Sequence, residues 1–489
     1  MRGINRLGWL MGVAVLATAQ AAAAETLQDA LALAYESNPA LQQQRAQLRA
    51  LDETYVQALS GYRPTLGVSA TAYYDRYSPS AGPSLTSRTA QATLSATQPL
   101  YTGGRVSAAV RAAEAQVLAG RESLRAQEAT VLQQVISAYV DVRRDTEIVE
   151  IRRANVDVIK AQLDETTARF KVGQLTRTDV ATVSAQHAQA RAALAAALGQ
   201  LKTSRAAYLT VIGRAPGTLA PQVPLPGAPK TLDEAFDTAE ARNPLLLAAS
   251  LKEQSDQALV AQARAARMPT VSASASFSRG AALGAYPDNN DQSTVVAGVT
   301  VTQPLFSGGL ISSQIRAALE QDNADRQALE QARRTTIQSV SVAWNQILAA
   351  RAGLAASREQ KEAAALAFEG LTQEFHAGLR TVFELVQAEQ GVRDAELSVA
   401  NADHDAYVAD AALLTAVGRL DVTSLGLEAR PYDPARNLDR VRGGPAALLD
   451  PVAGAVDGLN ANGTPRRLDP HLGTDLGPLK TAADTGQQP

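Results

Sequence analysis

The chain repeats several unusual phrases at one constant spacing of 205 positions. Three pairs share this spacing: "QPLYTGGR" at Gln98 and "QPLFSGGL" at Gln303, "TLQDALALAYESNP" at Thr26 and "TLDEAFDTAEARNP" at Thr231, and "LTVIGR" at Leu209 and "LTAVGR" at Leu414. Anchors so far apart stay in register, and the period far exceeds the ~20 to 50 residues of a solenoid unit. We therefore expect one module used twice, over residues 25–214 and 231–420, with a proline-rich connector over 215–230.

The first 24 residues have the pattern of a secretory signal peptide. Arg2 and Arg6 precede an apolar run over residues 7–17, and Ala22 and Ala24 fit a small-residue cleavage site. A short membrane anchor is the alternative, but the run is too short for a spanning helix. No later stretch approaches 18 consecutive apolar residues.

The composition argues against several classes of function. The chain has no cysteine, which leaves no disulfide, no thiolate metal site and no lipidated cysteine after the signal. The net charge of −3 becomes −5 without the two signal arginines and gives no support for nucleic-acid binding. The four histidines lack ligand spacing, and phosphate-loop, nucleophile-elbow and zinc-protease motifs are missing. We expect no enzyme, no cofactor and no metal site.

Four segments alternate strictly between apolar and small polar residues: about 65–77, 88–98, 270–279 and 294–303. This period of two predicts β-strands, each long enough to cross a membrane at a tilt, with turn-rich loops joining each pair. A half-buried sheet of a soluble protein would alternate in the same way. However, one face is mostly alanine and valine and the other serine and threonine, which suits lipid on one side and a wet lumen on the other.

Long helices follow each pair of strands. Residues 105–172 contain no proline and one glycine, and residues 310–377 contain no proline and two glycines. Good helix formers dominate both stretches, and heptad spacing of valine and leucine predicts coiled-coil packing. A helix of ~65 residues would be ~100 Å long. Breaks at Gly173 and Gly378 predict that each helix turns back into a second one, with hairpin tips at about 171–179 and 376–384.

The phrase "QPLYTGG" and its copy stand where strand changes to helix. Proline ends strand pairing, the aromatic residue suits the membrane interface, and the two glycines allow a sharp bend. The predicted transition residues are Pro99, Tyr101, Gly103, Gly104, Pro304, Phe306, Gly308 and Gly309.

One chain supplies four membrane strands, whose open edges cannot face lipid. Two chains would give eight strands, with little more than side-chain room inside, whereas three give twelve and an open lumen. The expected fold is therefore mainly α with transmembrane β, as a trimeric 12-stranded β-barrel that continues into an α-helical barrel. Residues 421–489, rich in proline and glycine, are expected to be a largely disordered tail.

Together the motifs "SNP"/"RNP", "QPLYTGG"/"QPLFSGG", "RFKVGQLTRTDV" and "LTVIGR"/"LTAVGR" resemble the TolC family of bacterial outer-membrane efflux proteins, over about residues 25–420. The resemblance implies a homotrimeric channel-tunnel in outer-membrane lipid, with its helical barrel in the periplasm. It also implies a periplasmic adaptor and an inner-membrane ABC or proton-driven transporter as partners. Without a cysteine after the signal, the chain is more similar to the unlipidated branch, which includes type I secretion ducts and drug-efflux ducts.

The resemblance assigns roles to the hairpin tips, which close the tunnel in this family. Matching residues are Thr178, Asp179, Phe375, Arg380 and Glu384. We expect Arg380 to pair with Asp179 of a neighbouring hairpin and Glu384 to form a threefold acidic ring, while Phe375 stands where the family often has tyrosine. Alternatively these charges only solvate a helix turn, since exposed pairs contribute ~0–1 kcal/mol. Expected adaptor-docking residues are Val172, Gly173, Leu175, Gly378 and Leu379.

The leading hypothesis is an exit duct of a tripartite export system for type I protein secretion. A duct of the same fold for drugs and other small molecules is the first alternative. The second is a periplasmic coiled-coil adaptor or structural protein without a pore, which the alternating strands disfavour.

Overall fold

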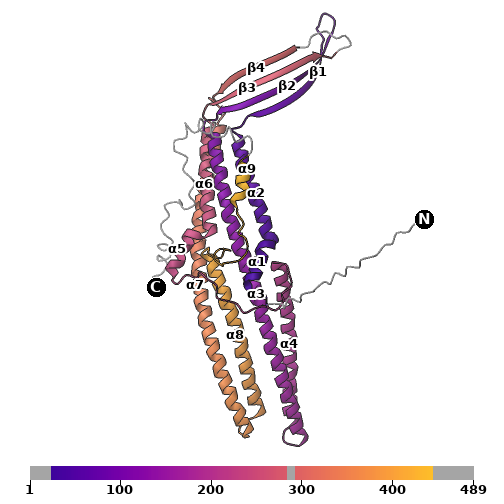
Figure 1. Cartoon of the computed structure of the whole chain (residues 1–489), viewed down its shortest axis with the longest axis vertical. Coiled ribbons are helices and arrows are strands. Elements are labelled where there is room, and N and C mark those ends of the chain that lie inside the picture. The colour runs from indigo at the N-terminus through magenta and orange to yellow at the C-terminus, as the bar shows by residue number, and fades with distance from the viewer. Residues whose placement is uncertain (1–23, 284–291, 444–489) are drawn as a thin grey trace, which may run out of the picture.

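The computed structural model describes residues 24–283 and 292–443. Figure 1 shows an elongated molecule with a layer of strands at one end and long helices running away from it. The elements are α1 (Leu27–Ser37), α2 (Pro39–Ser60), β1 (Thr65–Tyr77), β2 (Leu85–Tyr101), α3 (Arg105–Lys171), α4 (Arg177–Ile212), α5 (Leu232–Arg242), α6 (Pro244–Ala265), β3 (Thr270–Ala282), β4 (Gln292–Thr302), α7 (Leu310–His376), α8 (Val382–Ala416) and α9 (Ala435–Arg442). The predicted mainly helical fold with a small sheet and a duplicated module is confirmed.

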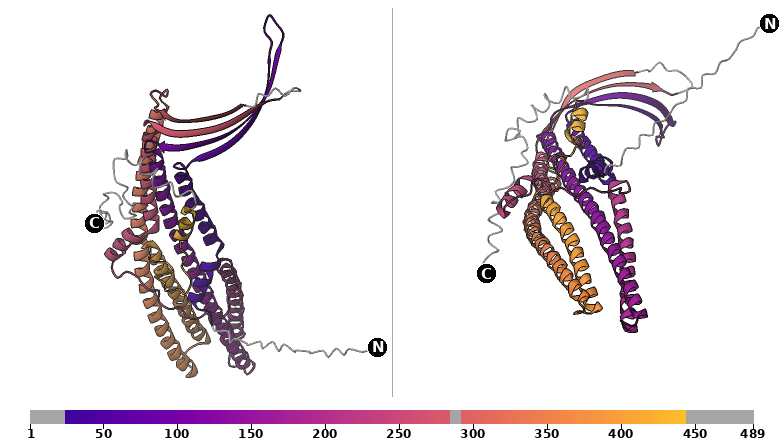
Figure 2. Two further views of the ribbon diagram at one scale, coloured as in Figure 1. Left: turned by 45° about the horizontal axis from the view of Figure 1, so that its top comes forward. Right: turned by 60° about the horizontal axis from the view of Figure 1, so that its bottom comes forward.

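Within the described residues the strands form one antiparallel sheet in the order β1-β2-β3-β4. Figure 2 shows it as a single curved layer at the end of the helices. The register places Val68 opposite Leu94, Leu94 opposite Phe277 and Phe277 opposite Val295, so that the apolar residues share one face and the small polar residues the other. β1 and β4 are the edge strands, and within the part of the chain that the structure describes neither pairs with a further strand on its outer side. Every residue of β1 and β4 is exposed in the single chain.

The long helices α3 and α7 each contain 67 residues and pack along α4 and α8 as two helical hairpins. Their tips lie at the end of the molecule opposite the sheet (Figure 1). No helix of the described residues is both long and apolar enough to cross a membrane.

The duplication extends to individual hydrogen bonds. Asn38 caps α2 and donates from Nδ2 to the Val211 carbonyl at 3.0 Å. Asn243 caps α6 and donates in the same way to the Ala416 carbonyl at 2.8 Å. In both copies the proline that follows occupies the first helical position, where a missing N–H costs nothing.

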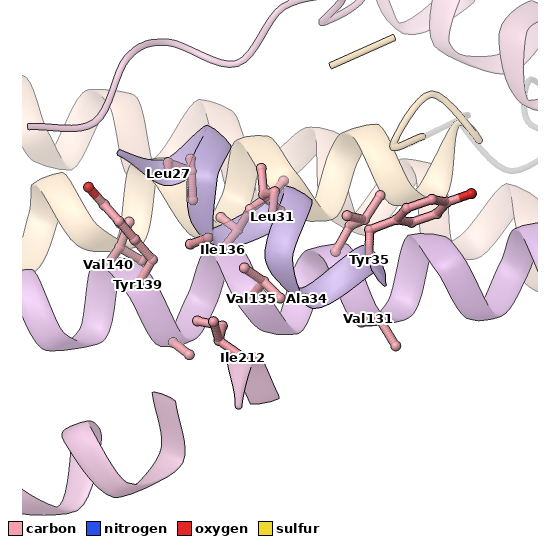
Figure 3. Packing of buried hydrophobic residues seen from close by; sticks show 14 of the residues in the cluster. Leu27, Leu31, Ala34, Tyr35, Val131, Val135, Ile136, Tyr139, Val140 and Ile212 are labelled. Carbon is pink, nitrogen blue, oxygen red and sulfur yellow. The ribbon is translucent and has the colours of Figure 1, made fainter. Parts of the chain in front are cut away.

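The main core lies where α1 packs on the middle of α3 (Figure 3). Leu31 and Ala34 of α1 are buried beside Val135 and Tyr139 of α3. The Tyr139 hydroxyl oxygen lies 2.9 Å from the Glu25 carbonyl oxygen and 2.7 Å from the Ala220 carbonyl oxygen. Its single hydrogen can be donated to either of them. This side chain thereby ties the start of the first copy and the connector to the long helix.

The prediction that the chain is disordered from residue 421 is wrong for residues 421–443. Leu425, Leu427 and Ala429 are buried in the main core, and the Arg45 guanidinium lies 5.0 Å from the Tyr432 ring centroid. The prediction of disorder rested on the proline and glycine content of the whole segment, whereas a few apolar and aromatic side chains at its start are enough to pack it onto the core. Residues 444–489 of the tail, residues 1–23 of the expected signal peptide and residues 284–291 of the loop between β3 and β4 lie outside the described residues.

Candidate functional site

The first hairpin tip is a tight turn between α3 and α4. Gly173 has a φ of +79°, which strongly favours glycine, and Val172 beside it is 70% exposed. Thr176 caps α4, because its hydroxyl oxygen accepts from the Asp179 backbone N–H at 3.3 Å. In return the Asp179 carboxylate accepts from the backbone N–H and the hydroxyl of Thr176 at 2.8 and 2.7 Å. The side-chain and backbone hydrogen bonds from Thr176 lower the pKa of Asp179. Leu175 packs partly buried against the apolar cluster behind the tip, and Thr178 follows in the first turn of α4.

The second tip repeats this geometry and adds an ion-pair network. Gly378 has a φ of +76°, and Leu379 is 75% exposed. Arg380 lies 2.7 Å from the Glu374 carboxylate through Nε and 3.0 Å from the Glu384 carboxylate through Nη1. Glu384 also accepts from Thr381 in the cap of α8.

These contacts bear on the predicted gate pairs. In the single chain Arg380 pairs inside its own hairpin, because Glu384 follows it by one helical turn. Asp179 is engaged in its own helix cap. A pair between Arg380 and Asp179 of a neighbouring hairpin, or a ring of Glu384, stays a prediction that would require these local contacts to rearrange.

Phe375 is packed where the two hairpins meet. Its side chain is 8% exposed and belongs to a cluster with Ile159 and Val183 of the first hairpin and Val386 of the second. The Arg169 guanidinium lies 5.4 Å from its ring centroid. The sequence singled out Phe375 only by family position and missed this packing against the other hairpin.

The strand-to-helix transitions differ between the copies although their backbones agree. Both glycine pairs have positive φ values: Gly103 +69°, Gly104 +86°, Gly308 +60° and Gly309 +87°. The register of β2 with β3 shifts between Pro99 and Tyr101, where β2 ends. A Cβ at Gly103 would lie 2.5 Å from the Met268 Cβ, which belongs to the short connection between α6 and β3.

At the second transition the surroundings are open. A Cβ at Gly308 would meet nothing within 4 Å in this chain. Phe306, two residues after Pro304, is 91% exposed, as is Leu305 between them. The first transition is thus covered by the same chain, whereas the second offers bare apolar surface.

A charged cluster that the sequence did not predict joins α3 to α8. His404 Nε2 lies 2.9 Å from the Asp141 carboxylate, and Nδ1 lies 2.9 Å from the Asp405 carboxylate. Arg144 contacts Asp141 at 3.2 Å and Asp145 at 2.8 Å. His404 lies 263 positions from Asp141, so no local spacing could reveal that the two ends of the cluster meet. Among the described residues, no group of three or more histidines, cysteines and acidic residues could hold a metal ion.

Comparisons with known proteins agree with this geometry. The model of the family described as "Outer membrane efflux protein" matches residues 30–214 and 235–419. The chain is 35% identical over 428 residues to outer membrane efflux protein BepC of Brucella suis, covering 87% of this chain and 92% of that protein. It is 29% identical to alkaline protease secretion protein AprF of Pseudomonas aeruginosa, covering 71% of this chain and 74% of the relative.

A solved structure shows the same fold. The Campylobacter jejuni CmeC outer membrane channel has a TM-score of 0.73 to this chain at 14% identity. The similarity covers 85% of this chain and 89% of CmeC.

Proposed function

Since the chain belongs to the outer membrane efflux protein family, we propose that it is a homotrimeric exit duct for type I protein secretion. Family membership makes it an outer-membrane efflux channel of a tripartite export system rather than an enzyme. It also removes the alternative of a periplasmic coiled-coil protein without a pore. Trimer formation, the gate and the cargo are the proposed parts.

The two edge strands, β1 and β4, are the observation that best supports assembly into a trimer. Inside one chain, β2 of the first copy pairs with β3 of the second, with Leu94 opposite Phe277. The repeat of 205 residues transfers this junction to β4 of one protomer and β1 of the next, with Val299 opposite Ala72. Three protomers would then close twelve strands without an edge that faces lipid.

Differences in exposure between the two copies support the same assembly. Phe375 is 8% exposed because the first hairpin covers it, whereas the matching Phe170 is 41% exposed. Gly103 lies against Met268, whereas the matching Gly308 lies in open space. In a trimer with approximate sixfold symmetry, the next protomer would cover Phe170 and Gly308.

We assign the periplasmic gate and the docking surface to the hairpin tips. Val172 and Leu379 expose apolar side chains beside the turn glycines Gly173 and Gly378. Apolar side chains at an outermost turn, joined by Leu175 behind them, offer a surface for the periplasmic adaptor. The Arg380 pairs are exposed and therefore weak, which suits contacts that have to exchange when the tunnel opens.

The proposed cargo is a secreted protein. AprF is named for alkaline protease secretion, and serine and threonine dominate one face of the sheet, which offers a polar lining. The alternative is efflux of small molecules, and the more similar BepC is named an outer membrane efflux protein. An inner-membrane transporter supplies the energy in either case: an ABC protein for type I secretion, or a proton-driven pump for many small molecules.

A deletion strain tests the cargo. We expect at least one protein to disappear from the culture medium and to return when the gene is restored, with drug susceptibility unchanged. Unchanged medium proteins together with increased drug susceptibility would refute type I secretion and support small-molecule efflux.

Single-channel conductance tests the gate. Arg380→Ala removes both ion pairs at the second tip, and we expect a larger mean conductance than in the wild type. Arg334→Ala is the matched control, because Arg334 is exposed and pairs with Glu330 one turn away in the same helix. An unchanged conductance in Arg380→Ala would refute the gate at this residue.

A further inference from the structure

The far end of the β1–β2 hairpin carries an acidic residue between two tyrosines on one face of the sheet. Tyr73, Asp75 and Tyr77 alternate along β1, so their side chains share one face and follow each other at about 7 Å. This is the serine and threonine face, because Ser69 and Thr71 precede them at the same spacing. The tyrosine side chains are 54% and 67% exposed, and Asp75 is exposed as well, so all three are accessible.

The three residues lie at the end of the sheet furthest from the helices. Tyr73 stands opposite Thr89, and Thr89 pairs on its other side with Ala282, the last residue of β3. Asp75 and Tyr77 therefore lie beyond the end of β3, where the β1–β2 hairpin extends past its neighbour (Figure 2). In a closed barrel this level is the rim of the lumen, on the side away from the helices.

Asp75 is the only charged residue on the serine and threonine face of the described strands. The other charged residues of these strands are Arg76, Arg88 and Arg279, and alternation and register place them on the apolar face. Within the described part of the chain, the Asp75 carboxylate accepts no hydrogen bond and forms no ion pair. A negative charge of this kind on a polar lining attracts cations.

The second copy of the module lacks this group of residues. The positions that match it in the repeat of 205 are occupied by Ser278, Gly280 and Ala282. The second copy thus gives a lining of small residues without a charge or a ring, and the first copy departs from that pattern only at its far end. In a trimer the three sets lie at one level around the rim, because the threefold axis relates them.

The combination of a carboxylate and two rings decides which solute fits. Rings of acidic side chains favour cations in channels, whereas a tyrosine adds attraction only for a cation that lies over its face within about 6 Å of the centroid. Because the rings flank Asp75 at about 7 Å on either side, an organic cation bound at its carboxylate reaches both faces. Quaternary ammonium and guanidinium groups are weakly hydrated cations that aromatic rings recognise in this way.

We propose that Tyr73, Asp75 and Tyr77 of each protomer bind organic cations at the outer mouth of the channel and make it selective for cationic solutes. The inference rests on the proposed function, since the serine and threonine face has to line the lumen of a closed barrel. It adds the chemical class that the outer mouth favours: ammonium and guanidinium groups, including the lysine and arginine side chains of a passing polypeptide.

Block of single channels by tetraethylammonium tests the site. The full-length protein is added to one chamber of a planar bilayer, inserts with its sheet first, and meets the blocker from the opposite chamber, which is the outer side. We expect millimolar tetraethylammonium to block the wild type, and Asp75→Asn to weaken this block about tenfold, whereas Asp75→Glu keeps it. The double variant Tyr73→Leu and Tyr77→Leu should weaken the block about fivefold, as expected for two exposed cation–π contacts.

Ion selectivity separates the charge from the rings. At about 0.1 M potassium chloride, screened attraction by three carboxylates predicts a preference for potassium over chloride about threefold greater in the wild type than in Asp75→Asn. The double tyrosine variant should keep the selectivity of the wild type, because potassium keeps its hydration shell and gains little from the rings. An equal loss of selectivity in both variants would indicate a structural change at the rim and refute the site.

Arg76→Gln is the matched control, because Arg76 follows Asp75 on the opposite face of the same strand. This variant should show the block and the selectivity of the wild type. A change in either would place Arg76 in the lumen and refute the assignment of the two faces. Equal block of the wild type and Asp75→Asn would refute the site, and equal block of the wild type and the double tyrosine variant would refute recognition of organic cations.

The behaviour of the wild type separates this inference from the proposed function. A wild type that forms no channel would refute the proposed function and the site with it. A wild type that conducts ions but is not blocked by tetraethylammonium from the outer side would refute the site and leave the proposed duct standing.

Discussion

Replacement of His404 by glutamine should weaken the contact between α3 and α8 in a pH-dependent way. Both ring nitrogens lie 2.9 Å from a carboxylate oxygen, which favours the doubly protonated ring. Burial lowers the pKa of His404, but the hydrogen bonds with Asp141 and Asp405 outweigh it, and the net pKa is raised. Arg144, which also contacts Asp141, opposes protonation.

The magnitude follows from the exposure of the two partners. The His404 side chain is 13% exposed and that of Asp141 37%, so a hydrogen bond between charged groups there contributes about 1.5–3 kcal/mol before solvent screening. Asp405 is 68% exposed, and its pair adds about 0–1 kcal/mol. Solvent screening at the two exposed carboxylates reduces this sum, so a total stabilisation of about 1–3 kcal/mol is expected.

The sign of the pH dependence follows from the raised pKa. The unfolded histidine titrates near pH ~6.5, so the stabilisation is fully present below that pH and is lost as pH rises through the raised pKa of the folded protein. Wild type and His404→Gln should thus differ most in thermal stability at about pH 6 and least at about pH 9.

Thermal unfolding followed by helical circular dichroism at one fixed scan rate measures this difference. His187→Gln is the control, since His187 lies on α4 and is not a member of the charged cluster of His404, Asp141 and Asp405. A gap between wild type and His404→Gln that is equal at both pH values would refute the reasoning. So would a His187→Gln variant with the same pH-dependent loss.

Two further predictions concern the transitions and the C-terminal segment. Gly103→Ala places a Cβ 2.5 Å from the Met268 Cβ. The positive φ at this position adds a backbone strain of about 1–2 kcal/mol to that clash, so the variant should show a reduced helical circular-dichroism signal. Gly308→Ala should preserve that signal but lower the trimer fraction in light scattering, and equal effects of both variants on the helical signal would contradict this. Tyr432→Ala removes the ring that lies against the Arg45 guanidinium, a contact that contributes about 1–2 kcal/mol. The variant should therefore be cleaved faster by protease within residues 421–443, whereas Tyr432→Phe, which keeps the ring, should be cleaved like the wild type.

The repeated parts of the fold could be predicted because their signals are local. Alternation identified the strands, although β2 extends to Leu85–Tyr101, beyond the alternating core that was predicted. Pairing of Leu85 with Tyr77 lengthens it, and pairing is a property of two strands rather than of one. Likewise, the glycines predict the chain reversals at both tips and the sharp bends at both transitions.

Contacts between distant segments could not be predicted. His404 and Asp141 lie 263 positions apart and meet only because α8 packs along α3. Phe170 and Phe375 occupy equivalent positions, yet only the second is covered within the chain. Tyr432 lies in a segment rich in proline and glycine, and its partner Arg45 lies near the other end of the chain, so no local pattern predicts their contact.

A disulfide between protomers tests the central claim, a barrel closed by three chains in the register of the repeat. The chain contains no cysteine, so Val299→Cys with Ala72→Cys introduces the only pair of thiols. Directly paired strand residues lie about 4.5–5.5 Å apart at Cα, which permits a disulfide. Val299→Cys with Ala70→Cys is the control, on the same face but two residues out of register.

A barrel closed by three chains in this register predicts that oxidation of the first variant in membranes gives a covalent trimer on a non-reducing gel, whereas the control stays monomeric. Efficient cross-linking of the control instead, or a monomer in both variants, would contradict it.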